Sequence, residues 1–307
     1  MYTDIKKFIH LSDEIIAAKK KNLPIVALES TIITHGMPAP DNYEIALEAE
    51  HLIRRNECVP ATIAILDGII KIGLSKNEIQ TLSKNAEAVK LSTDNLPLSI
   101  AKQKTGSTTV AATLLLSAMA DIQVFATGGI GGAHRGCETD FDISADLKQL
   151  AESPVNVICA GPKAILDIPK TIEILESLGV PLITYKSKNI PAFWSRDSGV
   201  KSALVAETVT EISNSFKILS MLGLKSGQLI CNPIPFKDEI SIEIIEPLIQ
   251  QSIKLANKHN ITGKDLTPFL LTQILQNTEG KSLESNKALL LNNIDLASKI
   301  AINLKCD

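Results

Sequence analysis

The chain has 307 residues, of which 45% are hydrophobic but only 4% aromatic, so a large core must be built mainly from isoleucine, leucine, valine and alanine. The chain has 31 lysines and arginines and 34 aspartates and glutamates, which gives a formal net charge of −3. It therefore has no excess of basic residues of the kind typical of nucleic-acid-binding proteins. The five cysteines have no C-x-x-C spacing, and no stretch approaches the ~20 apolar residues of a membrane span. We therefore expect a soluble, cytoplasmic protein with no nucleic-acid partner and no membrane partner.

Continuous apolar runs predict strands that helices cover on both faces. These runs are residues 24–30, 61–66, 88–92, 122–129, 155–161, 181–187 and 227–233. Asp67-Gly68 joins the second run to another apolar run and predicts a β-hairpin. Helical patterns lie between the runs, including residues 164–179. The sequence thus predicts a three-layer α/β/α fold with a mixed, mostly parallel sheet.

The C-terminal part of the chain is helical in pattern. Residues 237–261 and 282–304 have leucine-rich faces, which are candidates for an interface between subunits. No linker rich in proline, glycine or serine separates them from the preceding strands. We expect residues 1–307 to form a single domain with a helical C-terminal portion.

Polar residues follow five of the predicted strands, at 29–31, 90–92, 127–129, 161–163 and 186–187. Ligands of open α/β sheets collect outside the carboxyl ends of parallel strands. The sequence therefore predicts a ligand site at one rim of the sheet.

Two charged residues at this rim are candidates for chemistry. Lys163 stands after a buried strand, in the turn that opens the expected helix, and is either an amine nucleophile or a lysine directed to solvent. Amines that form Schiff bases are activated by burial or by a nearby cation. Glu29 ends a strand and is either a group that transfers protons or the partner of a neighbouring cation.

Two further stretches suit an anion or a metal ion. Residues 106–109 precede a helix, where they either bind an oxyanion through backbone N–H groups or cap the helix. The glycine-rich stretch 128–136 has neither the G-x-G-x-x-G pattern nor a P-loop, but it contains Arg135, which suits a phosphate. Four acidic residues follow, which suit Mg²⁺ or Mn²⁺ or else form a solvated loop before a helix near Ser144. They are Glu138, Asp140, Asp142 and Asp146.

Ten segments together resemble one family closely, the pseudouridine-5′-phosphate glycosidases, which also include proteins of indigoidine pigment pathways. The segments are 27–42, 59–68, 106–117, 124–136, 141–147, 157–167, 179–185, 191–194, 267–271 and 282–293. The resemblance implies reversible cleavage of pseudouridine 5′-phosphate to uracil and ribose 5-phosphate, one Mn²⁺ per subunit, and a homotrimer that binds only a small-molecule substrate.

The resemblance also implies roles for individual residues. Lys163 matches the covalent nucleophile, which forms a Schiff base with the ring-opened ribose; Glu29 matches the proton donor, and Asp142 the metal ligand. The residues that match substrate contacts are Lys90, Val110, Thr127, His134, Ser144, Ala145, Asp146 and Asn286. Pro162 departs from the small residue associated with the family, although proline is acceptable at the helix start expected here.

Two other functions fit the same residues. One is another Schiff-base enzyme, a phosphosugar lyase or aldolase that also uses Lys163. The other is a non-catalytic sensor of a nucleotide or sugar phosphate. Release of uracil would distinguish the glycosidase from a lyase or aldolase. Absence of turnover would indicate a sensor.

Overall fold

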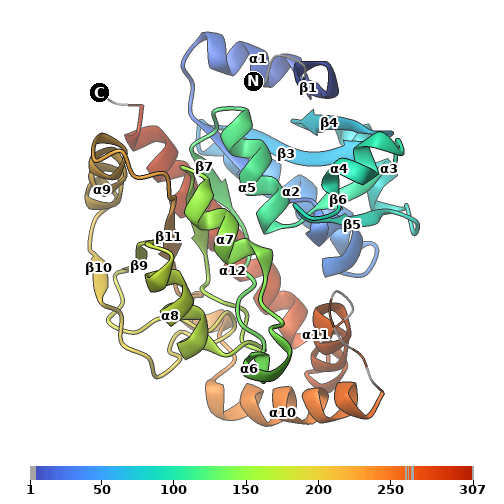
Figure 1. Cartoon of the computed structure of the whole chain (residues 1–307), viewed down its shortest axis with the longest axis vertical. Helices are drawn as coiled ribbons and strands as arrows, with labels where there is room; N and C mark the ends of the chain where they lie inside the picture. The colour runs from blue at the N-terminus through green and yellow to red at the C-terminus, as the bar shows by residue number, and fades with distance from the viewer. Residues whose placement is uncertain (1–4, 260, 262, 264–265, 306–307) are drawn as a thin grey trace.

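An eleven-stranded sheet forms the centre of the computed structural model, which describes residues 5–259, 261, 263 and 266–305 (Figure 1). The strands are β1 Ile9–Leu11, β2 Ile25–Leu28, β3 Val59–Leu66, β4 Ile69–Ile72, β5 Val89–Leu91, β6 Gly106–Thr108, β7 Val124–Ala126, β8 Asn156–Cys159, β9 Leu182–Tyr185, β10 Leu204–Ala206 and β11 Gln228–Cys231. The main path runs β1-β4-β3-β2-β7-β8-β11-β9-β10, with β6 beside β3 and β5 beside β6.

The sheet is mixed and mostly parallel, as predicted. From β3 through β2, β7, β8, β11 and β9 to β10, every neighbouring pair is parallel. Asp67 and Gly68 have positive φ angles and turn β3 into the antiparallel strand β4, with Ile65 opposite Ile70. The predicted hairpin is confirmed.

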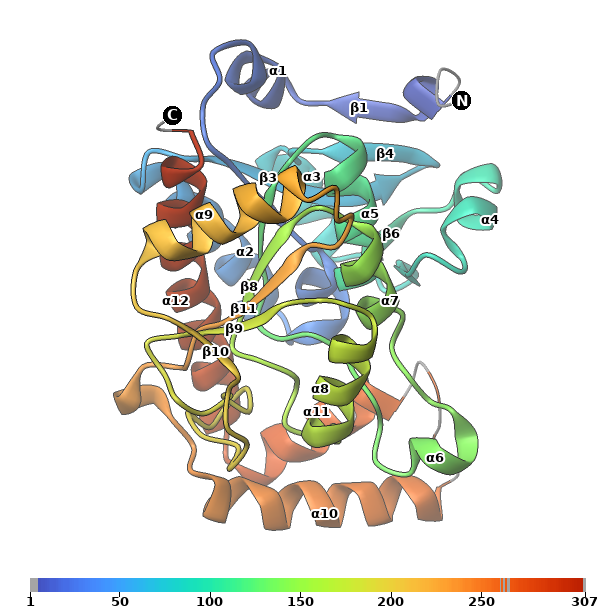
Figure 2. The ribbon, with the colours of Figure 1, turned by 60° about the vertical axis from the view of Figure 1, so that its left-hand side comes forward.

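Helices cover both faces of the sheet. They are α1 Asp13–Lys20, α2 Asp41–Arg55, α3 Lys76–Ser83, α4 Leu96–Ala101, α5 Val110–Met119, α6 Cys137–Asp140, α7 Ala145–Glu152, α8 Ile168–Ser177, α9 Val209–Met221, α10 Ile242–Lys258, α11 Leu266–Asn277 and α12 Lys281–Asn303, with short turns η1 Ile5–Phe8, η2 Ile32–Gly36 and η3 Phe236–Asp238. Figure 2 shows α12 running vertically along the left side of the sheet and α10 lying across the bottom of the molecule.

Alternation along the strands divides the core into two layers. Val26 and Leu28 of β2 face a cluster that includes Ile53 of α2 and Ile294 of α12. Ala27, between them, faces a second cluster with α5, α7 and α8. The predicted three-layer α/β/α architecture is confirmed, and each fully buried leucine or isoleucine contributes roughly 1.5–3 kcal/mol to it.

The helix expected over 164–179 starts later than predicted, at Ile168. The side chain of Asp167 accepts a hydrogen bond from the Lys170 N–H and caps the helix, as aspartate does at such positions. Lys163 and Pro162 therefore lie before the helix, in an irregular segment. The prediction that Lys163 stands in the turn that opens a helix is wrong, and so is the helix-start explanation of Pro162.

Residues 106–108, expected as a turn, form strand β6. Ser107 and Thr108 are fully buried, and the Thr108 hydroxyl donates to the Ile63 carbonyl at 2.7 Å. Thr109 follows as the N-cap of α5, so the helix-capping alternative is correct for this residue. Strands β1 and β10 were not predicted from the sequence.

The C-terminal helices are present, but their apolar faces are used within the chain. Helix α10 starts at Ile242 rather than 237, and residue 260 of the expected stretch lies outside the described residues. Leu289, Leu290 and Leu296 of α12 are buried in the core, because α12 packs between α2 and α9 on the sheet. These leucines of α12 are therefore used within the chain, and an interface between subunits formed by the C-terminal helices stays a prediction.

Two other expectations concern the membrane and the cysteines. In the described part of the chain, each helix is too short or too polar to span a bilayer. The four cysteines of that part are free and buried, and Cys306 lies outside it. The assignment of residues 1–307 to a single domain stays a prediction.

Gly161 shapes the start of the segment that carries Lys163. Its φ is +88°, and a Cβ atom there would lie 2.2 Å from the Pro191 carbonyl oxygen. We expect Gly161→Ala to lower the free energy of unfolding by more than the roughly 1–2 kcal/mol that a left-handed residue costs alone. Gly179→Ala is the matched control, since its φ is +69° and nothing lies within 4 Å of the added atom. Equal losses in urea unfolding of the two variants would show that the contact with Pro191 is unimportant.

Candidate functional site

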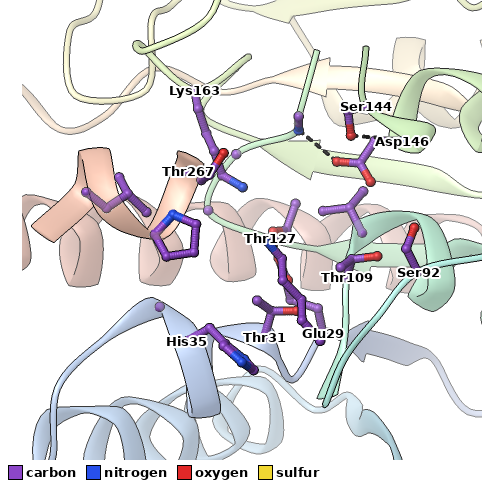
Figure 3. Close-up of a pocket in the computed structure, with 18 of the residues that line it drawn as sticks. Glu29, Thr31, His35, Ser92, Thr109, Thr127, Ser144, Asp146, Lys163 and Thr267 are labelled. Atoms are coloured by element: carbon purple, nitrogen blue, oxygen red, sulfur yellow. Dashed lines mark hydrogen bonds between the residues drawn. The ribbon is translucent and has the colours of Figure 1, made fainter. Parts of the chain in front are cut away.

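A cavity of about 390 Å³ opens at the carboxyl ends of β2, β5, β7 and β8, with α11 along one side (Figure 3). All eleven residues predicted for the site line it. They are Glu29, Lys90, Val110, Thr127, His134, Asp142, Ser144, Ala145, Asp146, Lys163 and Asn286. The order β2-β7-β8 brings together residues far apart in sequence because the three strands are parallel neighbours.

Lys163 reaches the cavity from the irregular segment after β8. Its backbone N–H donates to the Ile130 carbonyl at 3.1 Å, and the amine points into the cavity in Figure 3. The alternative of a lysine directed to bulk solvent is therefore wrong.

Glu29 lies at the floor of the cavity and accepts a hydrogen bond from the Thr127 hydroxyl. Burial raises the pKa of the Glu29 carboxyl above its ordinary value of 4.5, while the charge of Lys163 and the Thr127 hydrogen bond oppose the rise. The net effect is a raised pKa, so this carboxyl holds its proton to higher pH than an exposed glutamate. A carboxyl of this kind suits proton transfer.

Asp146 is buried, and backbone groups use both of its carboxylate oxygens. Oδ1 accepts from the Ala111 N–H at 2.9 Å, and Oδ2 accepts from the Gly131 N–H at 2.7 Å. Ser144 caps the helix that carries Asp146. The carboxylate thus joins the start of α5 to the glycine-rich stretch.

His134 and Asp142 lie on paired segments at the cavity wall. The His134 N–H donates to the Asp142 carbonyl at 3.0 Å. Burial lowers the pKa of His134; the charge of Asp142 opposes that effect and the charge of Lys163 adds to it. The lowered pKa favours a neutral imidazole, which can both donate and accept a hydrogen bond.

The four acidic residues after the glycine-rich stretch do not form one cluster. Glu138 pairs with Lys170 at 2.7 Å, and Asp140 accepts from the Asp142 N–H at 2.9 Å. The described residues contain no group of three histidine, cysteine or acidic side chains placed to hold a metal ion. Asp142 and Asp146 both line the cavity. Backbone N–H groups hold the Asp146 carboxylate, whereas the Asp142 carboxylate has no ion pair within the described part of the chain.

Two other rim residues differ from the prediction. Arg135, expected near a phosphate, lies outside the cavity lining and binds Glu246 instead. Lys186 and Ser187 also lie away from it, because β9 is separated from β8 by β11.

Polar groups gather at one end of the cavity. Ser92 and Thr109 lie there in Figure 3, and their near neighbours in sequence, Lys90 and Val110, also line the cavity. Gly106 cannot take part, because it is packed between strands with its Cα facing the Val89 carbonyl. Of the stretch 106–109, Thr109 alone remains a candidate for binding an anion together with Lys90.

Asn286 of α12 has a fixed orientation in the cavity. The Trp194 indole N–H donates to Asn286 Oδ1 at 2.7 Å. Because an indole can only donate, the amide oxygen must face Trp194 and the amide NH₂ is left for the cavity.

Sequence reasoning missed several lining residues, among them His35, Thr267 and Leu271, whereas Thr31 belongs to the predicted rim. All three fall inside segments that carry the family resemblance, 27–42 and 267–271, which was the available signal. His35 lies on η2, where its Nδ1 is 2.5 Å from the Thr34 hydroxyl.

Comparison with known proteins gives one consistent family. Residues 14–303 match the family described as indigoidine synthase A like protein. A protein of Glaesserella parasuis named pseudouridine-5′-phosphate glycosidase is 49% identical over 97% of this chain and 99% of its own length. A protein of Brachyspira hyodysenteriae with the same name is 46% identical over 97% of both chains.

Two solved structures share the fold. An indigoidine synthase A-like protein of Thermotoga maritima superposes with a TM-score of 0.88 at 33% identity. The prealnumycin C-glycosynthase AlnA, solved in complex with ribulose 5-phosphate, gives a TM-score of 0.90 at 30% identity. Each comparison covers 97% of this chain and of the other.

The hydrogen bond from Thr127 should control the proton affinity of Glu29. Because the hydroxyl stabilises the carboxylate, Thr127→Val should raise the Glu29 pKa further, so that the proton is lost at higher pH. Isotope-edited infrared titration, with Glu29→Gln to assign the band, measures this directly. Thr127→Ser keeps the hydroxyl and should leave the titration near that of the unaltered protein. A downward shift in Thr127→Val would contradict the assignment.

Proposed function

This chain belongs to the indigoidine synthase A-like family, and we propose that it is a pseudouridine-5′-phosphate glycosidase. The observation that carries the proposal is the presence of Lys163 and Glu29 in one cavity, close enough for the lysine charge to act on the carboxyl. Relatives of that name, 46–49% identical over nearly the whole chain, support the substrate.

The substrate explains why a lysine is needed. In pseudouridine the sugar is joined to uracil by a carbon–carbon bond, so the leaving group has no bridging oxygen for an acid to protonate, as it has in ordinary glycosides. An amine offers another route, because once its nitrogen is bonded to C1′ the nitrogen lone pair can form C=N and expel the uracil carbon from C1′.

The proposed reaction has three steps and consumes one water. Lys163 Nζ bonds to C1′ while the C1′–O4′ bond breaks, and O4′ takes a proton. The Nζ lone pair then forms C=N as the C1′–C5 bond breaks, the electron pair moves into the uracil ring, and C5 is protonated by Glu29. Water adds to the Schiff base and releases ribose 5-phosphate from Lys163. A protonated Glu29 at neutral pH is favoured by its raised pKa.

Mn²⁺ is proposed as the cofactor, with Asp142 as its protein ligand. A single half-buried carboxylate at the cavity wall fits a hard cation whose other positions are filled by water and substrate oxygens. When bound, the ion supplies positive charge that offsets the phosphate and orders the water around it. His134, Ser144 and Ala145 lie beside Asp142 and are proposed to contact the substrate.

Recognition of the phosphate and of the base is proposed to fall to different residues of the cavity lining. Lys90 and Thr109 offer a cation and a hydroxyl to the phosphate. The NH₂ group of Asn286 offers donors to a uracil carbonyl. The ribulose 5-phosphate bound to AlnA supports a phosphosugar for this fold.

The homotrimer implied by the resemblance and the cytoplasmic location expected from composition are both part of this proposal. Exposed apolar side chains at the end of α9, including Met221 and Leu222, offer a surface for self-association. Light scattering measures the assembly.

Lys163→Arg keeps a cation but removes the nucleophilic amine, so we expect uracil release with Mn²⁺ to fall by roughly 10³-fold or more. The assay follows ultraviolet absorbance after adding pseudouridine 5′-phosphate with and without Mn²⁺. Borohydride added with ribose 5-phosphate should attach one pentose phosphate to Lys163, detected by peptide mass. Near-normal turnover of Lys163→Ala would exclude covalent catalysis.

The same assay separates the alternatives. A trapped sugar without uracil release would indicate a phosphosugar lyase or aldolase. Neither turnover nor trapping with Mn²⁺ present would indicate a sensor.

Trp194→Phe should relax the choice of base, because the Asn286 amide becomes free to turn over. We expect the preference for uracil over cytosine, measured by calorimetry with ribose 5-phosphate present, to fall roughly threefold to tenfold. Asn286→Ala should remove that preference altogether. An unchanged preference in Trp194→Phe with an intact one in Asn286→Ala would contradict this mode of recognition.

A further inference from the structure

Arg135 forms a four-bond cluster outside the cavity. Its Nη1 donates to Glu246 Oε1 at 2.5 Å and its Nη2 to Glu246 Oε2 at 2.9 Å. Nη2 also donates to the Ala164 carbonyl at 3.1 Å, and Nε to the Leu166 carbonyl at 3.4 Å. All three guanidinium nitrogens of Arg135 therefore donate hydrogen bonds within the chain. The side chain that was expected to bind a phosphate instead binds a carboxylate and two backbone carbonyls.

Two of these acceptors belong to the segment that carries Lys163. Residues 162–167 lie between β8 and α8 without regular structure, so their backbone groups need other partners. The Lys163 N–H bonds the Ile130 carbonyl, and the Asp167 N–H bonds the Ala133 carbonyl at 2.9 Å. Arg135 supplies the side-chain donors to carbonyls one and three residues beyond Lys163.

The other partner connects this segment to the wall of the cavity. Glu246 lies on α10, which packs against α11, and α11 contributes Thr267 and Leu271 to the lining. Figures 1 and 2 both show α10 at the bottom of the molecule, with α11 between α10 and the sheet. A displacement of α10 would therefore move Arg135 and, through the hydrogen bonds of Arg135 to the Ala164 and Leu166 carbonyls, the backbone around Lys163.

We propose that Arg135, held by Glu246, is a positioning residue that fixes the backbone around Lys163 for attack on the sugar. The consequence for the reaction rests on the proposed function. A catalytic atom displaced by about 1 Å can cost roughly 10²-fold in rate, because reacting atoms must meet in a narrow geometry. Because Arg135 bonds two carbonyls of the Lys163 segment directly, the loss of its side chain should act on the rate and on the local order of that segment.

Hydrogen exchange tests the positioning without using activity. In Arg135→Met, the amides of Lys163, Leu166 and Asp167 should exchange at least about fivefold faster, measured by mass spectrometry of peptides covering 160–168. Glu246→Gln keeps the Arg135 guanidinium but removes the charge of its carboxylate partner, so it should give a smaller increase in the exchange rate. The matched control is Gln250→Ala: Gln250 bonds the same carboxylate at 2.8 Å without touching Arg135 or the segment. Unchanged exchange in Arg135→Met would overturn the proposal.

Borohydride trapping tests the consequence for the amine. With ribose 5-phosphate, Arg135→Met should form the Lys163 adduct roughly 10- to 100-fold more slowly, with the sugar concentration for half-maximal rate within about threefold of the unaltered protein. Arg135→Lys should not restore the rate, because one ammonium cannot bond two carbonyls and a carboxylate in fork geometry. Full restoration by lysine would show that only charge matters and would overturn the positioning role.

The two proposals fail differently. If the unaltered protein neither traps the sugar nor releases uracil, the proposed function fails, and exchange still decides whether Arg135 fixes the segment. If the unaltered protein does both and Arg135→Met traps the sugar at the same rate, the positioning inference alone fails.

Discussion

Burial of a carboxyl group at the end of β2 is the constraint on which the rest of the site depends. In the floor of the cavity the charged form of Glu29 loses solvation, which raises its pKa and calls for compensating partners. One is the Thr127 hydroxyl, at the end of the adjacent strand β7, and the other is the charge of Lys163, beyond β8. Three consecutive parallel strands thus supply the acid, its hydrogen-bond donor and its counter-charge. Strand order, more than strand number, determines the chemistry available here.

The loops beyond these strands are held by two side chains of opposite charge. Asp146 accepts hydrogen bonds from two backbone N–H groups and so joins α5 to the glycine-rich stretch. Arg135 donates to two backbone carbonyls and joins that stretch to the Lys163 segment. Both meet the same need, since backbone outside helices and strands must find its hydrogen bonds elsewhere. The glycine-rich stretch, which lacks the sequence pattern of a nucleotide-binding loop, is therefore held in place by side chains of the chain itself.

The sequence predicted those features that depend on local pattern. Continuous apolar runs gave the main strands, and the common direction of parallel strands implied that Glu29, Thr127 and Lys163 meet at one rim. Lys90 was expected there for the same reason, but it reaches the cavity from β5, which is parallel to β6 and so runs opposite to β3. Strand β6 was missed because its glycine, serine and threonine residues do not form an apolar run; they are buried through hydrogen bonds to β3 and to Ser30. The bond between Arg135 and Glu246 spans 111 residues, and nothing in the local sequence of either residue indicates the other. Long-range partners of this kind determine the functional geometry, and local pattern does not reveal them.

The placement of Glu29 links stability to function. Its pKa is higher in the folded protein than in the unfolded chain, so its contribution to stability is fully present below the unfolded pKa and is lost as pH rises through the folded one. At neutral pH the buried Glu29 carboxyl therefore lowers the free energy of unfolding, and the contacts with Lys163 and Thr127 reduce this loss. The same two contacts place a lysine amine and a proton-holding carboxyl on one side of a ligand-sized cavity. The arrangement that makes the buried carboxyl tolerable is thus also the one that makes an acid-assisted amine reaction possible.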